Sequence, residues 1–274
     1  AIGTCFIVDS EVMVYQAYDS ATSILTVKRA ALDTHPALHL KDKMAFFYDA
    51  FSAFDTTQYL DGEELEAKIL TTTPSGILSF QDAQTLPLAI KGRGIRPYPP
   101  NNIKINGEYY IAKTLVSSDV VVTWVDRNRL QQTGGSILGW VDGTITKEAG
   151  VTYSLELIDT DSGSLVHSAT GINATTYTID KSLLHINKIH KLKLWSVRDG
   201  FDSLLKFEHS FLIEAEEVTL TATAFKDKVT GSTLSVANVN VVVDESMTAN
   251  MKWDGSQIIG KAEPNATITI EVQD

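Results

Sequence analysis

The stretch Val151-Thr-Tyr-Ser-Leu-Glu-Leu157 decides the fold, because apolar and polar side chains alternate along it. Successive side chains of a β-strand point to opposite faces, so the apolar side chains of this stretch share one face. The same period of two recurs at residues 120–124, 192–194, 205–213, 239–243 and 268–272. No segment of about twelve or more residues has the apolar period of an amphipathic helix. The alternation therefore predicts an all-β protein.

Turn-forming pairs such as Asp142-Gly143 and Asp199-Gly200 separate these predicted strands. Parallel strands need a crossover of helix length, and none is predicted, so we expect tandem antiparallel β-sandwich or barrel domains. Residues 62–70 remain open between two structures. Their composition favours a helix, yet Leu65, Ala67 and Ile69 alternate as in a strand. Residues 181–185 are expected to form one short turn of helix.

Two changes in composition divide the 274 residues into three predicted domains. The run IKGRGIRPYPPNNIKI, residues 90–105, contains prolines that fix φ and remove hydrogen-bond donors, so it predicts a stiff spacer between residues 1–96 and 97–213. The acidic step Glu214-Ala-Glu-Glu217 begins a third domain, residues 214–274. A domain of this size is near the lower limit for independent stability, so we expect it to lean on a neighbour.

The middle segment, residues 97–213, suits a seven-stranded sandwich that resembles a fibronectin type III module. The resemblance rests on PPNNIKI, VVVTW, YSLELID and KLKLWSV, and His190 stands where that family places a corner tyrosine. A long insertion, residues 127–150, separates the second and third strands. The expected strands are residues 100–105, 119–125, 152–158, 164–168, 175–179, 191–197 and 204–213.

Composition and charge exclude several classes of function. The net charge is −11, and no segment is basic, so nucleic acid is not an expected partner. Cys5 is the only cysteine, which excludes an intrachain disulfide and a cysteine-based zinc site. No apolar run is long enough for a membrane-spanning helix. The first residues, AIGTCFIVDSEV, are typical of a strand rather than a signal peptide, so we expect the first domain to be incomplete at its N-terminus.

An ordered series of motifs resembles the C-terminal part of the tail hub proteins of siphophages and gene transfer agents. Its members are CFIVDSEVMVYQAYD, LTVKRAALDTHPALHLKDKMAFFYD, QYLDGEELEAKILTTTPSG, GRGIRPYPP, VVTWVDRNRLQQTG and YSLELIDTDSG. The series covers residues 1 to about 212. The sequence departs from the family pattern at Ala30-Ala31, where a glycine is common, at Asp42, and at Val125-Asp126.

This resemblance implies a structural virion protein and not an enzyme. It would be made in the host cytoplasm and placed at the tail tip or baseplate, where hubs close the tail tube. The implied partners are other tail proteins, two further copies in a homotrimer, and a host cell-surface receptor or glycan. No cofactor or metal is implied. The segment GKAEPNATITIEV near the C-terminus resembles bacterial immunoglobulin-like repeats.

Two other functions compete with the tail hub. Tandem sandwiches also build bacterial surface adhesins that bind carbohydrate, and they serve as accessory modules of polysaccharide-degrading enzymes. The candidate binding or interface residues are Arg127, Arg129, Trp140 and Tyr98. The two arginines suit a carboxylate clamp, but we expect them to pair with acids at a domain seam, with Asp126, Asp142 and Glu148 as partners. The two aromatic rings suit sugar stacking or a protein interface, and core or hinge packing is the simpler prediction.

Two acidic groupings have a chemical interpretation as well as a structural one. Asp9, Glu11 and Asp33 are candidate paired carboxylates for glycoside cleavage, although solvated acids at a strand end are expected. Asp33, His35 and His39 are candidate metal ligands. Pro36 follows His35 directly and argues for a turn, so we expect no metal there.

Overall fold

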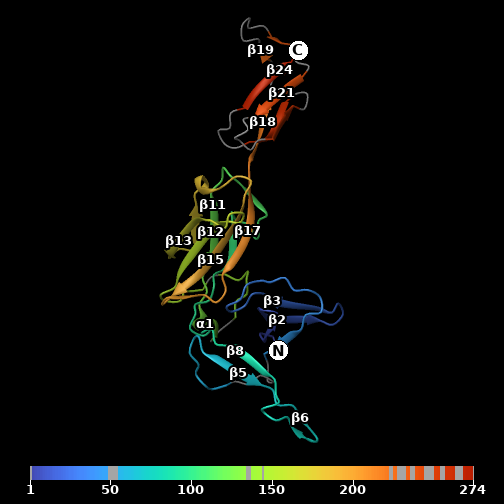
Figure 1. Cartoon of the computed structure of the whole chain (residues 1–274), viewed down its shortest axis with the longest axis vertical. Helices are drawn as coiled ribbons and strands as arrows, with labels where there is room; N and C mark the ends of the chain where they lie inside the picture. Colours follow the sequence, from blue (N-terminus) through green and yellow to red (C-terminus); the bar gives the residue numbers. More distant parts are fainter. Residues whose placement is uncertain are drawn as a thin grey trace.

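The computed structural model describes residues 2–48, 55–133, 137–143, 145–221, 225–226, 233–234, 238–243, 250–253, 257–262 and 268–273, with side chains up to Ala215. Figure 1 shows an elongated arrangement. The N-terminal strands lie at one end, a β-sandwich lies in the middle, and the C-terminal strands extend from the far end of the sandwich. Strands dominate the described residues and their sheets are almost entirely antiparallel, which confirms the all-β prediction.

The N-terminal part builds a four-stranded sheet, called the first sheet, and two ribbons. The sheet has the order β3-β2-β1-β4 and comprises β1 (Cys5–Val8), β2 (Glu11–Asp19), β3 (Ile24–Lys28) and β4 (Ala45–Phe47). One two-stranded ribbon pairs β5 (Glu64–Lys68) with β8 (Thr85–Ala89). The other pairs β6 (Thr72–Thr73) with β7 (Gly76–Ile77). Residues 64–68 are therefore a strand, which settles the ambiguity of residues 62–70 in favour of the alternation.

Two sheets pack face to face in the sandwich. The smaller has the order β14-β11-β9 and comprises β9 (Asn101–Ile105), β11 (Val120–Val125) and β14 (Thr176–Ile179). The larger has the order β10-β17-β15-β12-β13, with β16 (Phe201–Asp202) pairing β15 at one end. Its other members are β10 (Lys113–Leu115), β12 (Thr152–Asp159), β13 (Leu165–Ile172), β15 (Ile189–Arg198) and β17 (Phe207–Glu214).

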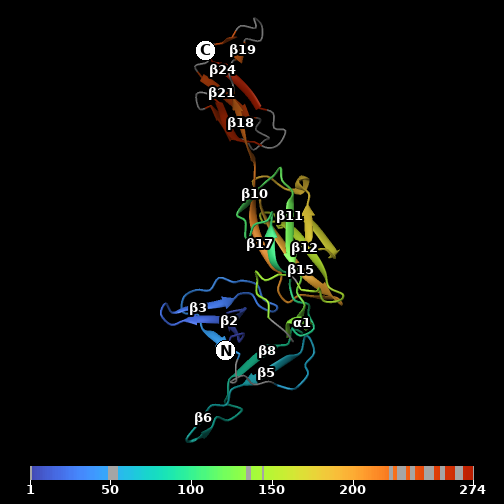
Figure 2. The same cartoon turned by 180° about the vertical axis from the view of Figure 1, so that it is seen from behind.

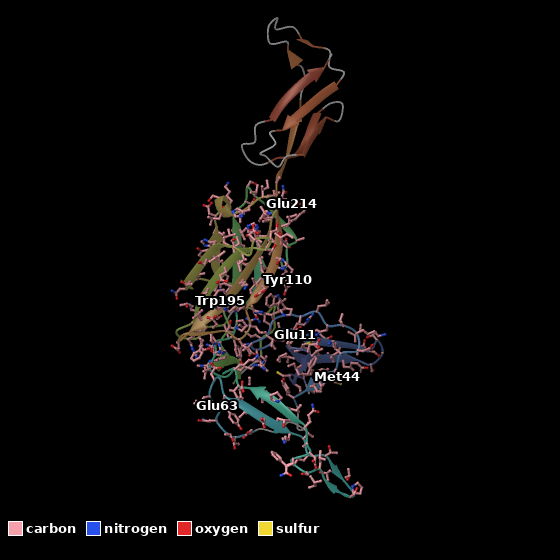
Figure 3. All side chains as sticks on the ribbon, viewed as in Figure 1. Glu11, Met44, Glu63, Tyr110, Trp195 and Glu214 are labelled. Atoms are coloured by element: carbon pink, nitrogen blue, oxygen red, sulfur yellow. The ribbon has the colours of Figure 1, made fainter. Side chains whose placement is uncertain are left out.

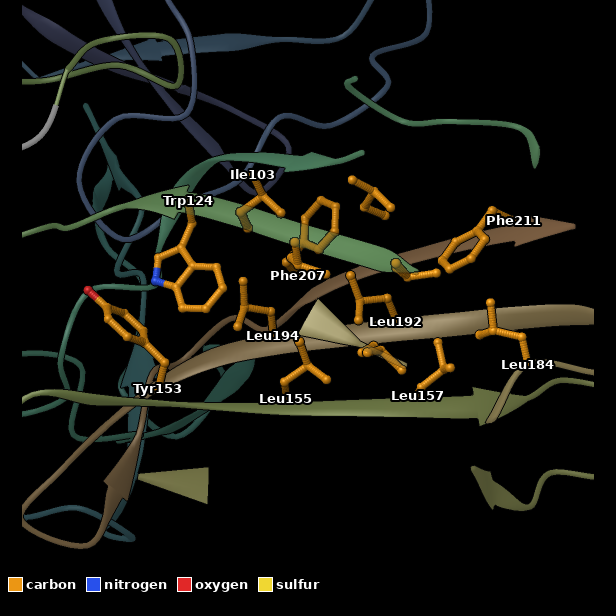
Figure 4. Packing of buried hydrophobic residues seen from close by; sticks show 14 of the residues in the cluster. Ile103, Trp124, Tyr153, Leu155, Leu157, Leu184, Leu192, Leu194, Phe207 and Phe211 are labelled. Atoms are coloured by element: carbon orange, nitrogen blue, oxygen red, sulfur yellow. The ribbon is translucent and has the colours of Figure 1, made fainter. Parts of the chain in front are cut away.

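The inward faces of both sheets form one apolar core (Figure 4). Leu155 and Leu157 on β12 lie beside Leu194 and Leu192 on β15 in register, and all four are fully buried. Burying one such side chain contributes roughly 1.5–3 kcal/mol. Strand β12 contains most of the stretch that predicted the fold, and the alternation of that stretch places its apolar side chains in this core.

All seven predicted sandwich strands are present within a few residues of their expected bounds. The arrangement is a fibronectin type III-like β-sandwich, as the sequence predicts. Three elements add to it. β10 pairs with β17 in parallel, a short helix α1 (Arg129–Thr133) follows β11, and a 3-10 turn (Lys181–Leu183) lies where one helical turn was expected.

The C-terminal strands continue almost directly from the sandwich, because only Ala215 separates β17 from β18 (Glu216–Thr221) (Figure 2). One sheet has the order β18-β23-β22, with β22 (Asn250–Trp253) and β23 (Gln257–Ala262). Two further pairs join β19 (Phe225–Lys226) to β20 (Thr233–Leu234) and β21 (Asn238–Val243) to β24 (Ile268–Gln273). Within the described residues, no helix has the length and apolar character needed to cross a membrane.

Candidate binding site at the junction of the first sheet and the sandwich

The linker of residues 90–100 is held by ion pairs from its own arginines. Arg93 makes a two-point contact with Asp33, at 2.5 Å from Nε and 2.6 Å from Nη2. Arg96 Nη2 lies 3.1 Å from the Asp61 carboxylate, and Arg96 Nη1 donates to the Asp202 carbonyl oxygen at 3.2 Å. Arg93 and Arg96 therefore hold the linker to the rest of residues 1–96, the first segment, and to the sandwich, and they do not form a free basic patch.

Arginines of the sandwich hold the linker backbone from the other side. Arg129 Nη1 donates to the carbonyl oxygen of Gly94, and Arg198 Nη2 donates to that of Ile95 at 2.7 Å. The buried Glu148 carboxylate positions both guanidinium groups, with Arg129 Nε 2.9 Å from Oε1 and Arg198 Nη1 bonded to the same oxygen. The expected pairing of Arg129 with Glu148 is thus present.

The insertion after β11 packs directly on the first sheet. The backbone N–H of Trp140 donates to the Arg29 carbonyl oxygen at 2.7 Å, and Lys28 Nζ lies 3.0 Å from Asp142 Oδ2. A Cβ on Gly139 would lie 2.9 Å from Lys28 Cβ and 3.0 Å from the Arg29 carbonyl oxygen. We call this contact surface, formed by residues 28–37, 93–101 and 137–142, the seam. The expected spacer function of the proline-rich run is wrong, because the two parts are in contact and Pro97, Pro99 and Pro100 are buried.

Replacing Gly139 with alanine is expected to loosen the seam and to cost roughly 1–3 kcal/mol, because the added methyl group meets backbone that cannot move freely. Gly143→Ala is the matched control, since no atom of the described residues other than its chain neighbours lies within 4 Å of a Cβ at Gly143. Urea unfolding monitored by tryptophan fluorescence measures both variants. Equal midpoints for the two variants would contradict the packed seam.

Aromatic rings fill the centre of the seam. The rings of Trp140 and Phe207 stack with centroids 6.2 Å apart, and His35 meets Trp140 edge-on at 5.8 Å. His35 Nε2 lies 3.3 Å from the Pro100 carbonyl oxygen. Burial lowers the pKa of His35 to about 4, so the imidazole is neutral at pH 7. Trp140 therefore packs in the core, the simpler of its two predictions, and His35 belongs to the same packing.

A cavity of about 480 Å³ opens at the seam and brings together two of the four predicted site residues, Tyr98 and Arg129. Its lining also includes Asp33, Arg93 and Tyr48. Both guanidinium groups already face carboxylates, Arg93 with Asp33 and Arg129 with Glu148. Because these charges are compensated, the two guanidinium groups do not form a site for a free anion.

Arg127 lies apart from this cavity. Its Nη2 donates to the Gly139 carbonyl oxygen at 2.5 Å, and its Nη1 donates to the Asp126 carbonyl oxygen at 3.2 Å. Burial lowers the pKa of Arg127 to about 10, and the charge of Asp142 opposes that shift. Arg127 therefore supports the insertion from within, and the two predicted arginines do not form one clamp, because helix α1 begins at Arg129 and turns it away.

A second cavity, about 420 Å³, is lined by Trp140, Tyr109, Tyr110 and Pro36 among others. The rings of Tyr110 and Trp140 are nearly parallel, with centroids 6.3 Å apart. Trp140 is only 6% exposed, so little of its indole ring is accessible from the cavity. Sugars stack on exposed ring faces, and here the accessible rings are those of the two tyrosines.

The carboxylates proposed for glycoside cleavage are occupied by structural contacts. Glu11 is fully buried and accepts hydrogen bonds from Arg29 Nε at 2.9 Å, Ala30 N–H at 2.9 Å and Ala37 N–H at 2.8 Å, with His39 Nε2 at 2.9 Å. Burial alone would raise the pKa of Glu11, but the hydrogen bonds from Arg29 and Ala37 lower it overall. This carboxylate organises the turn between β3 and β4 and has no free lone pair directed at a substrate site.

The candidate metal ligands of the first segment separate in the structure. Asp33 pairs with Arg93, His35 lies against Trp140, and His39 lies between Asp9 and Glu11. Sequence reasoning missed the seam contacts of Arg93, Arg96 and Arg198. The three cations of the linker run and the length of the insertion at residues 127–150 were the available signals.

Comparisons with known proteins add little to this geometry. No protein-family profile matches the chain, and no curated protein matches it. Among solved structures, the crystal structure of the FN1–FN3 domains of chicken CNTN1 is similar at 10% identity, with 99% of this chain and 88% of that chain covered and a TM-score of 0.26. At this TM-score the likeness carries no functional argument, and the fibronectin type III-like assignment of the middle domain rests on its own strand order.

Proposed function

We propose that the chain is a structural subunit of a tail hub or tail tip of a siphophage or gene transfer agent. Residues 1–96 would assemble with further copies, most simply as a homotrimer, and with other tail proteins. The sandwich and the C-terminal strands would project outward toward a host receptor. Two observations support the proposal: the ordered series of motifs in the sequence and the exposed apolar surface of residues 1–96.

The observation that carries the proposal is the exposed apolar surface of the first segment. An isolated two-stranded ribbon is marginally stable in water. The ribbons β5-β8 and β6-β7 and the chain between them nevertheless expose large apolar side chains, among them Ile69 at 71%, Ile77 at 67% and Leu88 at 54%. Most exposed large hydrophobic side chains of the described residues lie before residue 97. The contacts within a ribbon hold it only marginally. Burial of these side chains against a neighbouring subunit would stabilise the ribbons.

The first sheet adds a second apolar surface. A groove of about 500 Å³ is lined by Ile2, Tyr15, Tyr18, Leu25 and Phe47 among others. Tyr18 is 55% exposed and Phe47 43%. Both surfaces lie on the same segment, and the C-terminal strands lie at the opposite end of the chain (Figure 1). Assembly through the first segment would therefore leave the C-terminal end free to reach outward.

Immunogold electron microscopy tests where the protein resides. Antibodies raised against the sandwich are expected to label the tail tips of virus-like particles released by the source organism. Particles assembled from a genome that lacks the gene serve as the control. Label on intact cell surfaces, with none on particles, would contradict the tail hub and favour the adhesin.

The aromatic cavity at the seam keeps the carbohydrate-binding adhesin as a second candidate, because Tyr109 and Tyr110 are 39% and 47% exposed beside Trp140. A glycan array with the wild-type chain and with Tyr109→Ala tests it. Glycan binding that the substitution abolishes would support this candidate, and an array without signal would count against it.

A further inference from the structure

Three side chains with metal-binding atoms meet at the end of the sandwich that is remote from the seam. Asp159 ends β12, His190 lies near the start of β15, and His185 lies in the loop between the 3-10 turn and β15. The Asp159 carboxylate and the two imidazoles place one ligand atom each within 4.8 Å of one another. None of the three belongs to the seam or to the apolar surfaces of the first segment.

The distances suit one shared ion. Asp159 Oδ2 lies 3.5 Å from His185 Nδ1, which is long for a hydrogen bond. Two ligands that bind one ion at about 2.1 Å in tetrahedral geometry are about 3.4 Å apart. The two imidazole centroids are 5.6 Å apart, and the His185 side chain is 59% exposed, so its ring has room to adjust.

The carboxylate is oriented in advance. Asp159 Oδ1 accepts the backbone N–H groups of Asp161 at 2.9 Å and of Ser162 at 3.0 Å, which leaves Oδ2 directed at the histidines. The two turn N–H groups therefore hold the carboxylate in one orientation before any ion binds.

The surroundings of the buried His190 are not explained by an ion pair between Asp159 and His185. His190 is fully buried, its Nδ1 lies 3.4 Å from the Lys188 carbonyl oxygen, and its Nε2 has no hydrogen-bond partner among the described residues. A carbonyl beside Nδ1 favours the tautomer that leaves Nε2 with a lone pair, as in ligating histidines. A pair of Asp159 with His185 alone would leave this buried nitrogen unsatisfied, which costs free energy.

We propose that Asp159, His185 and His190 bind a divalent transition metal ion of the zinc type, with at least one coordination position open toward solvent on the side of His185. Two imidazoles and one carboxylate are a ligand set that such ions accept. The ion would tie the loop of His185 to the end of β12.

The site would also stiffen the exit toward the C-terminal strands. Asn187 N–H donates to the Ile213 carbonyl oxygen at 2.8 Å, and Ile213 N–H donates to the Lys188 carbonyl oxygen at 2.9 Å. The loop that carries His185 is thus bonded to the last residues of β17, directly before β18. A metal ion bound to this loop would hold the loop and the end of β17 in a fixed orientation. It would thereby stiffen the point at which the C-terminal strands leave the sandwich.

The test is zinc titration of the full chain by calorimetry, with visible absorption of the cobalt-substituted protein as a second readout. Wild-type chain is expected to bind one ion. Asp159→Asn keeps an oxygen that can accept the turn N–H groups, and His185→Ala removes an exposed ring, so both variants are expected to fold. Each is expected to weaken zinc binding at least about tenfold. His167→Ala, a histidine bonded to Tyr177 elsewhere on the sandwich, is expected to bind as wild type.

Circular dichroism of each variant confirms that the comparison is made on folded protein. Failure of the wild-type chain to bind zinc or cobalt would overturn the site. So would equal affinities of the wild type, Asp159→Asn and His185→Ala, because the ion would then be bound elsewhere.

Discussion

Replacing Glu11 with alanine is expected to unfold the first sheet, at a cost of about 3–5 kcal/mol, while the sandwich stays folded. The carboxylate is fully buried and is the common acceptor for Arg29, Ala30 and Ala37. Figure 3 shows Glu11 where the N-terminal strands meet the sandwich. Its removal leaves a guanidinium and two backbone N–H groups without their acceptor. Ala30 also has a φ of 51°, a left-handed conformation that costs an alanine free energy and that the Glu11 contact holds in place.

Hydrogen exchange with mass spectrometry separates the two parts of this result. Amides of β1 to β3 are expected to lose protection, and those of β12 and β15 are expected to keep it. Glu66→Ala, which removes an exposed carboxylate from ribbon β5-β8, is the control and is expected to change stability by about 0.5 kcal/mol or less. Unchanged protection in Glu11→Ala would show that this carboxylate does not organise the sheet.

The same carboxylate predicts a pH dependence. The pKa of Glu11 is lowered from its ordinary value of 4.5 in the folded chain, so the unfolded chain binds the proton more readily. The stability that Glu11 contributes is present above pH 4.5 and is lost as the pH falls through the folded-state pKa. The difference in urea midpoint between wild type and Glu11→Ala is therefore expected to shrink on acidification. A constant difference from pH 7 to pH 3 would contradict the assigned shift.

Glu148→Gln is expected to open the seam at the linker and to cost about 2–5 kcal/mol. The carboxylate is 3% exposed and binds Arg129 and Arg198, which in turn hold the Gly94 and Ile95 carbonyl oxygens. Glutamine keeps the shape but removes the negative charge that both guanidinium groups share, and the exposed Asp199, 3.2 Å from Arg198 Nε, then remains as a carboxylate beside Arg198. Glu156→Gln is the matched control, since Glu156 is half-buried on strand β12 of the sandwich between apolar core positions.

Trypsin reports this opening directly, because the Arg93-Gly94 bond lies in the linker that the two arginines hold. Cleavage at Arg93 under native conditions is expected to be at least about tenfold faster in Glu148→Gln, since 1.4 kcal/mol of easier opening corresponds to a factor of ten. Glu156→Gln is expected to be cut at the wild-type rate. A Glu148→Gln protein that resists trypsin as the wild type does would mean that the linker is held by other contacts.

The sandwich could be predicted from the sequence because its information is local. Leu155 and Leu157 alternate with polar neighbours, and an alternating strand can bury only one face. The ribbon of residues 64–68 was ambiguous because exposed strands lack that constraint, and Leu65 and Ala67 are not in a core. The parallel strand β10 was missed because three residues, Lys113–Leu115, carry no periodic pattern.

The seam and the histidine cluster could not be predicted, because each joins residues that are far apart in the chain. Gly139 packs on Arg29, and Asp159 meets His185 and His190 only after β12 and β15 have paired. The cations of the linker were visible in the sequence, but their partners Asp33 and Asp61 were not. The sequence offered three acids, Asp126, Asp142 and Glu148, as partners of the two predicted arginines, and the structure pairs Arg129 with Glu148.

The mass of the full chain in solution tests the central claim, that residues 1–96 assemble with further copies. Light scattering coupled to size-exclusion chromatography, over a range of protein concentrations, is expected to give three times the chain mass of 30.0 kDa. The double substitution Ile77→Asp and Leu88→Asp, on the exposed ribbons, is expected to return the mass to one chain without loss of the β-sheet signal. A wild-type chain that stays monomeric at every concentration would contradict the claim.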